Sequence, residues 1–172
     1  MKRLLIIFFF LLSTKVTANE EQKFVYIDME KILTTSKAGK FLLKQLTDIN
    51  EKNLKVFKKN EKELIDIEQK LTSQKNIISS EEMGKKIVSL KEKIKKFRDD
   101  NGDKIRNLNK LKIDNTNKLL NMINSILTTY ADKNSISIIF QKKNIIVGKT
   151  NLDVTKEIIL LVDSSIKEFK IY

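Results

Sequence analysis

The tetrapeptide Ser79-Ser80-Glu81-Glu82 lies near the middle of a long amphipathic region that extends from Lys37 to Asp132. Ser79, followed three residues later by Glu82, has the pattern of a capping box, in which the two side chains satisfy free amides in the first turn of a helix. The sequence therefore predicts that a second helix begins at this point and that residues 37–132 fold as a helical hairpin, with its tip near residues 79–84.

Apolar residues recur at intervals of three and four on both sides of the tetrapeptide, which is the period of a helix with one apolar face. Before it, the apolar positions are Leu42, Leu46, Ile49, Phe57, Leu64, Ile67, Leu71 and Ile78. After it, they are Ile87, Leu90, Ile94, Phe97, Leu108, Leu111, Leu119, Met122 and Ile126. Each helix thus has one narrow apolar stripe, and we expect the two stripes to cover one another. Asn53 and Asn60 fall on the first stripe, so a strict heptad coiled coil is not expected.

A rival turn signal lies at residues 99–103, where Gly102 follows two aspartates and an asparagine. Arm length decides between the two turns. A hairpin that closes at Ser79 has matched arms of forty-odd residues, about 60 to 70 Å long at roughly 1.5 Å per residue. Closing at Gly102 would leave much of the first arm without a partner, so we interpret Gly102 as a weak point or hinge in the returning helix.

Two short β-rich segments, Phe24–Ile27 and Ser135–Phe140, flank the hairpin, and we expect them to pair in one sheet. From about Val154 onward, apolar residues recur at helical spacing, which predicts a C-terminal helix. Thr155 is the candidate N-cap of this helix. The predicted fold class is α+β and mostly helical, in which a long antiparallel hairpin projects from a small body of strands and C-terminal helix. We place that body at residues 19–36 and 133–172.

The body is too small to be stable alone without disulfides or metal, and such domains commonly share a core between subunits. The sequence therefore predicts an oligomer. The apolar residues expected to form its core are Val25, Ile27, Ile136, Ile138, Phe140, Ile146, Ile158 and Leu161.

Residues 1–18 have the three parts of a secretory signal peptide: Lys2 and Arg3, the apolar run Leu4–Leu12, and the small-residue site Val16-Thr17-Ala18. The apolar run is shorter than the roughly 20 residues that a membrane-spanning helix needs. We therefore expect cleavage near Ala18 and export of the mature chain to the periplasm, where it should be soluble.

The sequence contains no histidine and no cysteine, so it lacks the commonest metal ligands, general bases and thiol nucleophiles. The four glycines are scattered singly, which argues against a phosphate-binding loop. Asp28 has no neighbouring partner that would tune it for catalysis, and a role at a strand end or turn is favoured. The prediction is a protein that is not an enzyme and that has no cofactor, metal or catalytic residue.

Most of the formal charge of +12 belongs to the hairpin, which contains 22 Lys and Arg residues and 14 Asp and Glu residues. Such an excess attracts acidic or anionic partners, although a solvated helix face also explains it. Phe41, Phe57 and Phe97 are expected to pack between helices. The candidate substrate-binding residues near the tip are Met83, Lys85, Lys86, Lys91, Lys93, Lys95 and Lys96.

The stretch from Phe24 to Leu33, followed by Ser36-Lys37-Ala38-Gly39-Lys40, resembles the opening of the Skp/OmpH family of periplasmic chaperones. Residues 135–140 and 144–147 look like the last strands of that family. Leu152-Asp153-Val154-Thr155 resembles its entry into the closing helix. The resemblance covers essentially the whole mature chain, but the hairpin shares only a pattern with the family, so no residue roles carry over there.

The resemblance implies a homotrimer whose hairpins surround a cavity and an ATP-independent holdase that binds unfolded outer-membrane proteins. Anionic lipid or lipopolysaccharide is a further partner that it implies for the basic surface. Two alternatives stay open: a basic hairpin that binds anionic lipid or another polyanion, and a structural periplasmic spacer. Export and the scarcity of arginine argue against nucleic acid.

Overall fold

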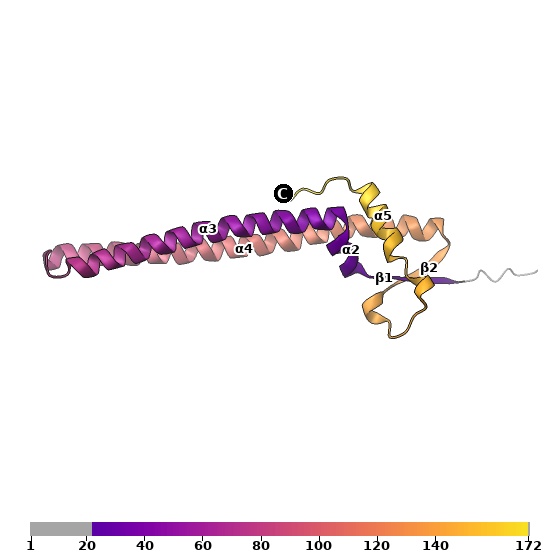
Figure 1. The fold of residues 1–172 in the computed structure, drawn as a ribbon, viewed down its shortest axis with the longest axis horizontal. Coiled ribbons are helices and arrows are strands. Elements are labelled where there is room, and N and C mark those ends of the chain that lie inside the picture. Colours follow the sequence, from indigo (N-terminus) through magenta and orange to yellow (C-terminus); the bar gives the residue numbers. More distant parts are fainter. Residues whose placement is uncertain (1–21, 172) are drawn as a thin grey trace, which may run out of the picture.

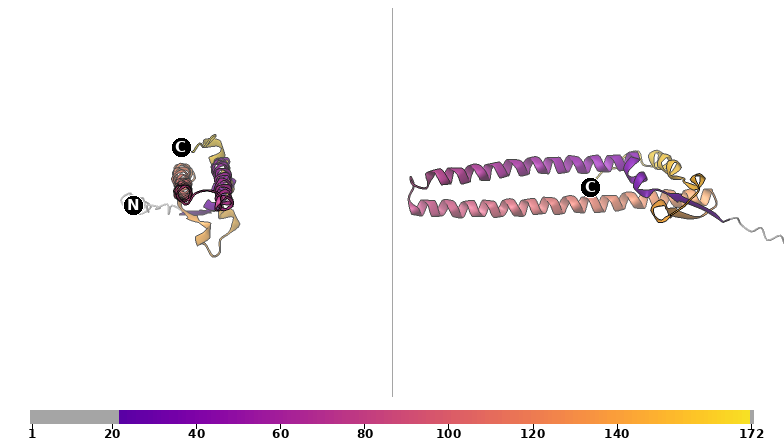
Figure 2. Two further views of the ribbon diagram at one scale, coloured as in Figure 1. Left: turned by 90° about the vertical axis from the view of Figure 1, so that its left-hand side faces the viewer. Right: turned by 60° about the horizontal axis from the view of Figure 1, so that its bottom comes forward.

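The computed structural model describes residues 22–171, so the signal peptide expected at residues 1–18 lies outside the described residues. A long two-helix arm extends from a small body at one end (Figure 1). Helix α3 covers Lys37–Gln74 and helix α4 covers Ser80–Lys133. The two helices run side by side and antiparallel along the arm (Figure 2). The predicted fold class, a helical hairpin on a small mixed body, is confirmed.

The reversal between α3 and α4 takes only the five residues 75–79. The Ser79 hydroxyl oxygen accepts a hydrogen bond from the Glu82 backbone N–H at 3.2 Å, so the predicted N-cap is confirmed. Glu81 and Glu82 lie in the first turn, where negative charge interacts favourably with the helix dipole. The rival turn does not form, because α4 continues as one helix through Gly102.

Strand β1, Lys23–Ile27, pairs with strand β2, Ile136–Gln141, in one sheet, as the sequence predicted, and the structure shows that the two strands are parallel. A parallel pair needs a long crossover connection, and here the whole hairpin provides it. Ser135 has a φ of 51°, a left-handed conformation that ends α4 and delays the strand by one residue relative to the prediction. Within residues 22–171 the sheet has two strands, and such small sheets are marginally stable unless they pack against other elements.

Side-chain caps make the joints between these elements. Asp28 caps helix α2, Met29–Thr35, by accepting from the Lys31 N–H at 2.9 Å. Ser36, which is fully buried, caps α3 by accepting from the Gly39 N–H at 3.2 Å. The chain therefore turns sharply twice between β1 and the arm, and each turn is held by a short polar side chain.

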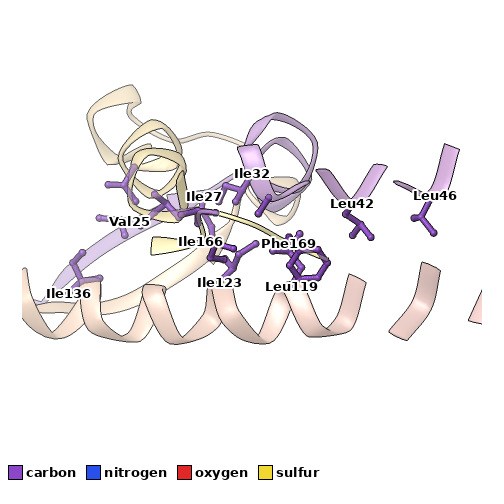
Figure 3. Close-up of a cluster of buried hydrophobic side chains, with 14 residues drawn as sticks. Val25, Ile27, Ile32, Leu42, Leu46, Leu119, Ile123, Ile136, Ile166 and Phe169 are labelled. Carbon is purple, nitrogen blue, oxygen red and sulfur yellow. The ribbon is translucent and has the colours of Figure 1, made fainter. Parts of the chain in front are cut away.

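Helix α5, Thr155–Ser165, covers the body, and the hydrophobic core lies where β1, α2, α5 and the roots of α3 and α4 meet (Figure 3). Its most buried side chains include Ile32, Leu119, Ile123, Ile158 and Val162. The root of the arm is thus part of the body core, whereas the rest of the arm has only the contacts between its two helices.

Two local predictions are wrong. Residues 144–147 form no strand: two short 3₁₀ turns, Lys142–Asn144 and Thr150–Leu152, enclose a loop with no neighbouring strand to pair with. Thr155 is the first helical residue of α5 and not its cap. Its hydroxyl instead accepts from the Asp28 N–H at 2.9 Å and donates to the Asp153 carboxylate, which joins α5 to the end of β1.

Candidate functional site

The interface between α3 and α4 is filled by the arm's own side chains. The rings of Phe57 and Phe97 pack with their centroids 5.1 Å apart, so the prediction that they pack between helices is confirmed. Phe41 differs from that prediction, because it lies outside the interface and is exposed. The two apolar stripes therefore stabilise the arm and leave few of their own residues for a partner.

A second set of large apolar side chains is exposed along the arm. The sequence analysis placed Ile87 and Met122 on the interface stripe and expected Phe41 to pack between helices, and the structure exposes all three. The other members were not singled out from the sequence, because they fall between the members of the stripe. A search for apolar residues that break the stripe would have found them. The whole set is Phe41, Leu43, Leu54, Val56, Ile65, Ile77, Ile87, Val88, Ile105, Ile113 and Met122. Ile87 and Val88 are consecutive, and Phe41 and Leu43 flank the buried Leu42. The others are separated by charged and polar residues, so the set forms several small apolar contacts and not one large patch.

The tip of the arm exposes Ile77 more than any other apolar residue of the arm, with 79% of its surface accessible. Ile77 and Ile78 are consecutive, so only one of them can lie on the apolar stripe. This was the signal in the sequence that one isoleucine at the tip would be exposed. Met83, the contact candidate from sequence, is half-buried in the first turn of α4. The structure thus places an exposed isoleucine at the tip beside the predicted methionine.

The six candidate lysines do not converge on one site. Three of them form ion pairs with acidic residues four positions away on α4: Lys85 with Glu81, Lys86 with Glu82 and Lys96 with Asp100. Among residues 22–171, Lys91, Lys93 and Lys95 form no ion pair. Exposed pairs of this kind contribute little to stability. The lysines therefore supply a diffuse positive field along the returning helix.

The arm packs imperfectly at its middle. Beside Gly102 a hollow of about 200 Å³ opens between α3 and α4, and its walls combine asparagines with Leu54, Phe57 and Ile105. The side-chain nitrogen of Asn101 is buried there without a hydrogen-bond partner. The asparagine on the α3 stripe, Asn53, also lines this hollow. The departure from a regular apolar seam predicted from sequence is therefore visible as a local packing defect.

The eight residues expected to form an oligomer core divide into two groups. Val25, Ile27, Ile136 and Ile158 are buried within the chain's own core. Ile138, Phe140, Ile146 and Leu161 are exposed on the body, and Ile146 is completely accessible. Only the second group is available to a partner.

Two members of the exposed group, Phe140 and Leu161, each border an apolar hollow. One, of about 420 Å³, lies between the sheet and the 144–148 loop and is lined by Phe24, Phe140 and Val147. The other, of about 670 Å³, lies between the end of α4 and α5 and is lined by Leu160 and Leu161. Strand β2 also has no strand beside its outer edge within residues 22–171. Apolar surface next to an unpaired strand edge is typical of an association surface.

The perturbed ionisable groups have structural roles. Burial and a hydrogen bond to Glu157 raise the pKa of Tyr130 to about 12. Burial alone would raise the pKa of Asp153, but hydrogen bonds from Thr155 and Lys142 bring that pKa below its usual value. The same contact raises the pKa of Lys142. The Glu157 carboxylate links α5 to Tyr130 of α4, and the Asp153 carboxylate links Thr155 of α5 to Lys142.

No group of three or more His, Cys, Asp or Glu side chains within residues 22–171 could hold a metal ion. Over the same residues, no helix combines the length and apolarity required to cross a bilayer. The features that remain as candidates for function are the outside of the arm and the apolar surface of the body.

Comparison with known proteins gives one family and one similar structure to report. Residues 23–161 match the family model described as outer membrane protein (OmpH-like). No curated protein matches. The fold is similar to a crystal structure from Caulobacter crescentus CB15, described as that of a candidate outer membrane chaperone (OmpH-like), with a TM-score of 0.82 and 12% sequence identity. That similarity covers 87% of this chain and 88% of the other.

Proposed function

This chain belongs to the OmpH-like family of outer membrane proteins, and on that premise we propose that it is an ATP-independent holdase of the periplasm. It binds unfolded outer-membrane proteins and prevents them from aggregating on their way to the outer membrane. The signal-peptide pattern at residues 1–18 supports the location. The observation that carries the proposal is the series of exposed apolar side chains along a positively charged arm.

An unfolded membrane-protein chain exposes apolar segments and needs many weak contacts, because no single sequence is common to all clients. The exposed apolar side chains of the arm offer contacts of this type, and each contact is one or two such side chains among charged and polar residues. The positive field attracts acidic chains at long range and speeds their encounter. Release requires no nucleotide, since a client that folds into the membrane leaves for a more stable state.

We further propose that three copies associate through the body, as the family resemblance implies. Exposed Ile138 and Phe140 on β2, the free edge of that strand and the exposed 144–148 loop support this assembly. Association would cover the apolar surface that a single chain leaves in water. Three arms fixed at one base would then surround a client, so that weak contacts act together.

The test is an aggregation assay. The chain without residues 1–18 is titrated into an outer-membrane barrel protein diluted from denaturant, and light scattering is followed without nucleotide at low and moderate salt. We expect scattering to fall to a minimum near one trimer per client. Equal scattering with and without the protein would refute the proposal. Client binding that vanishes at moderate salt would favour the polyanion alternative, because salt screens charge attraction but not apolar contact.

Replacing Met83 by Ser should weaken client binding by no more than about two- to fivefold, because one contact on the order of 0.5–1 kcal/mol is lost among many. Replacing Val56, Ile65 and Ile113 together by Ser should weaken client binding at least about tenfold, since each exposed apolar side chain contributes on the order of 0.5–1 kcal/mol. Quenching of client tryptophan fluorescence measures both, because this chain has no tryptophan. A large effect of Met83→Ser alone would indicate one dominant site at the tip.

A further inference from the structure

The segment after α5, Ile166–Ile171, is here called the tail segment, and it lies beyond the residues that match the family model. It leaves the body and runs back along the root of the arm (Figure 1). Phe169 is only 3% exposed and belongs to the core cluster that contains Leu42, Leu46 and Leu119. Figure 3 shows its ring beside Leu119. The tail segment thus inserts one aromatic side chain at the root of the hairpin.

The tail segment is held through its backbone, the Phe169 ring and two isoleucines. Ile166 is 3% exposed within the core cluster, and Ile171 packs against that cluster. The Gln45 side-chain amide donates to the Phe169 carbonyl oxygen at 2.7 Å, and the carbonyl of the same amide accepts from the Ile171 N–H at 3.2 Å. These two backbone groups are two residues apart, which is how a neighbouring strand pairs with an extended chain. On the other side, the Lys118 ammonium lies 5.8 Å from the centre of the Phe169 ring.

The three charged residues of the tail segment contribute little to holding it in place. Lys167, Glu168 and Lys170 are exposed, and the only ion pair that they form within the described residues joins Glu168 to Lys170. Gln45 makes no contact with a side chain of the tail in the two bonds described, so any extended segment could form them. The site between Gln45 and Lys118, here called the groove, therefore takes an extended backbone with an aromatic residue and, two positions later, an aliphatic residue such as Ile171.

We propose that this groove is a binding site for an extended, aromatic-containing segment of an unfolded client and that the chain's own tail segment occupies it as a competitor. The inference rests on the proposed holdase function. Membrane β-barrels carry girdles of aromatic residues on alternating strands, so their unfolded chains are rich in segments of this chemistry. A tethered tail has an effective concentration in the millimolar range. A client already held by the arms presents its own aromatic residues at a comparable concentration and displaces the tail.

The first test uses the full chain. Replacing Phe169 by Ser removes the ring that holds the tail segment, so the groove becomes open and client affinity should rise about threefold or more. Lys167→Ser is the matched control, because it changes an exposed residue of the same segment and should leave the affinity unchanged. Circular dichroism checks that both variants remain folded. Unchanged or weaker client binding by folded Phe169→Ser would overturn the proposal and leave the tail as a brace of the arm.

A second test does not depend on that variant. A chain that ends at Lys167 is mixed with a fluorescently labelled synthetic peptide of residues 164–172, and anisotropy is measured. The peptide should bind the shortened chain at least about tenfold more tightly than the full chain, and a peptide with Phe169→Ser should not bind. Unlabelled, unfolded barrel protein should displace the bound peptide.

The outcomes separate the two proposals. If the full chain does not suppress client aggregation, the proposed function fails, whatever the peptide does. If it suppresses aggregation but the peptide does not bind the shortened chain, or binds and is not displaced by client, only the groove proposal fails. Binding with displacement supports the groove as a client site.

Discussion

Replacing Ile138 by Asp should convert the proposed trimer into monomers. Ile138 lies on β2 with 46% of its surface exposed, so a charge there leaves the chain's own core intact. In an assembly that covers β2, however, the carboxylate would be buried without a partner, which costs several kcal/mol at each of three equivalent positions. Light scattering after gel filtration should report three times the mass of the mature chain for the wild type and one mass for the variant.

The control for that experiment is Ile113→Asp. Ile113 is an isoleucine of similar exposure on the outside of the arm, away from the body. Its replacement should leave the mass of the assembly unchanged. A trimer that persists in Ile138→Asp would show that β2 lies outside the interface, and a wild-type chain that is stable as a monomer would contradict the shared core altogether. Circular dichroism distinguishes dissociation from unfolding, because a folded monomer keeps the helical signal.

The fold could be predicted largely from local signals. Ser79 and Glu82 specify a helix start through hydrogen bonds within four residues, and that cap forms as expected. The pairing of β1 with β2 followed from a geometric requirement, since a hairpin with equal arms brings its two ends together. Gly102 shows the limit of such signals. The local turn pattern there does not form a turn, and α4 continues through it, because a turn at Gly102 would leave much of α3 without a helix to pack against.

The site could be predicted less well, because exposure depends on contacts between distant parts of the chain. The body list mixed Ile158, which is fully buried, with Ile146, which is fully exposed, and apolar character alone does not distinguish them. The contact between Gln45 and Phe169 joins residues 124 positions apart through a side chain and a backbone group. The spacing of apolar residues along the sequence cannot predict a contact of that kind. The expected strand at 144–147 fails for a related reason, since a strand needs a backbone partner and, within residues 22–171, that loop pairs with neither β1 nor β2.

Replacing Gly39 by Ala should destabilise the chain strongly, although alanine is normally the better helix former by about 1 kcal/mol. A Cβ at position 39 would lie 1.8 Å from the carbonyl oxygen of Leu33 and 2.6 Å from its carbonyl carbon. Both atoms belong to the backbone of α2, so no side-chain rotation relieves the overlap. The joint between α2 and α3 would have to open, which disrupts the buried Ser36 cap. We expect a loss of about 2–3 kcal/mol and a thermal midpoint lower by about 5–10 °C.

Gly84→Ala is the matched control, since within the described part of the chain nothing outside the local helix lies within 4 Å of a Cβ built there. That variant should have an unchanged or slightly higher midpoint, because the same propensity gain meets no clash. Both midpoints are measured by circular dichroism at one protein concentration, as assembly makes them depend on concentration. Equal midpoints for the two variants would mean that the α2–α3 joint has room to move. The arm would then not be held at a fixed angle to the body by this contact, and Ser36 would have to hold it alone.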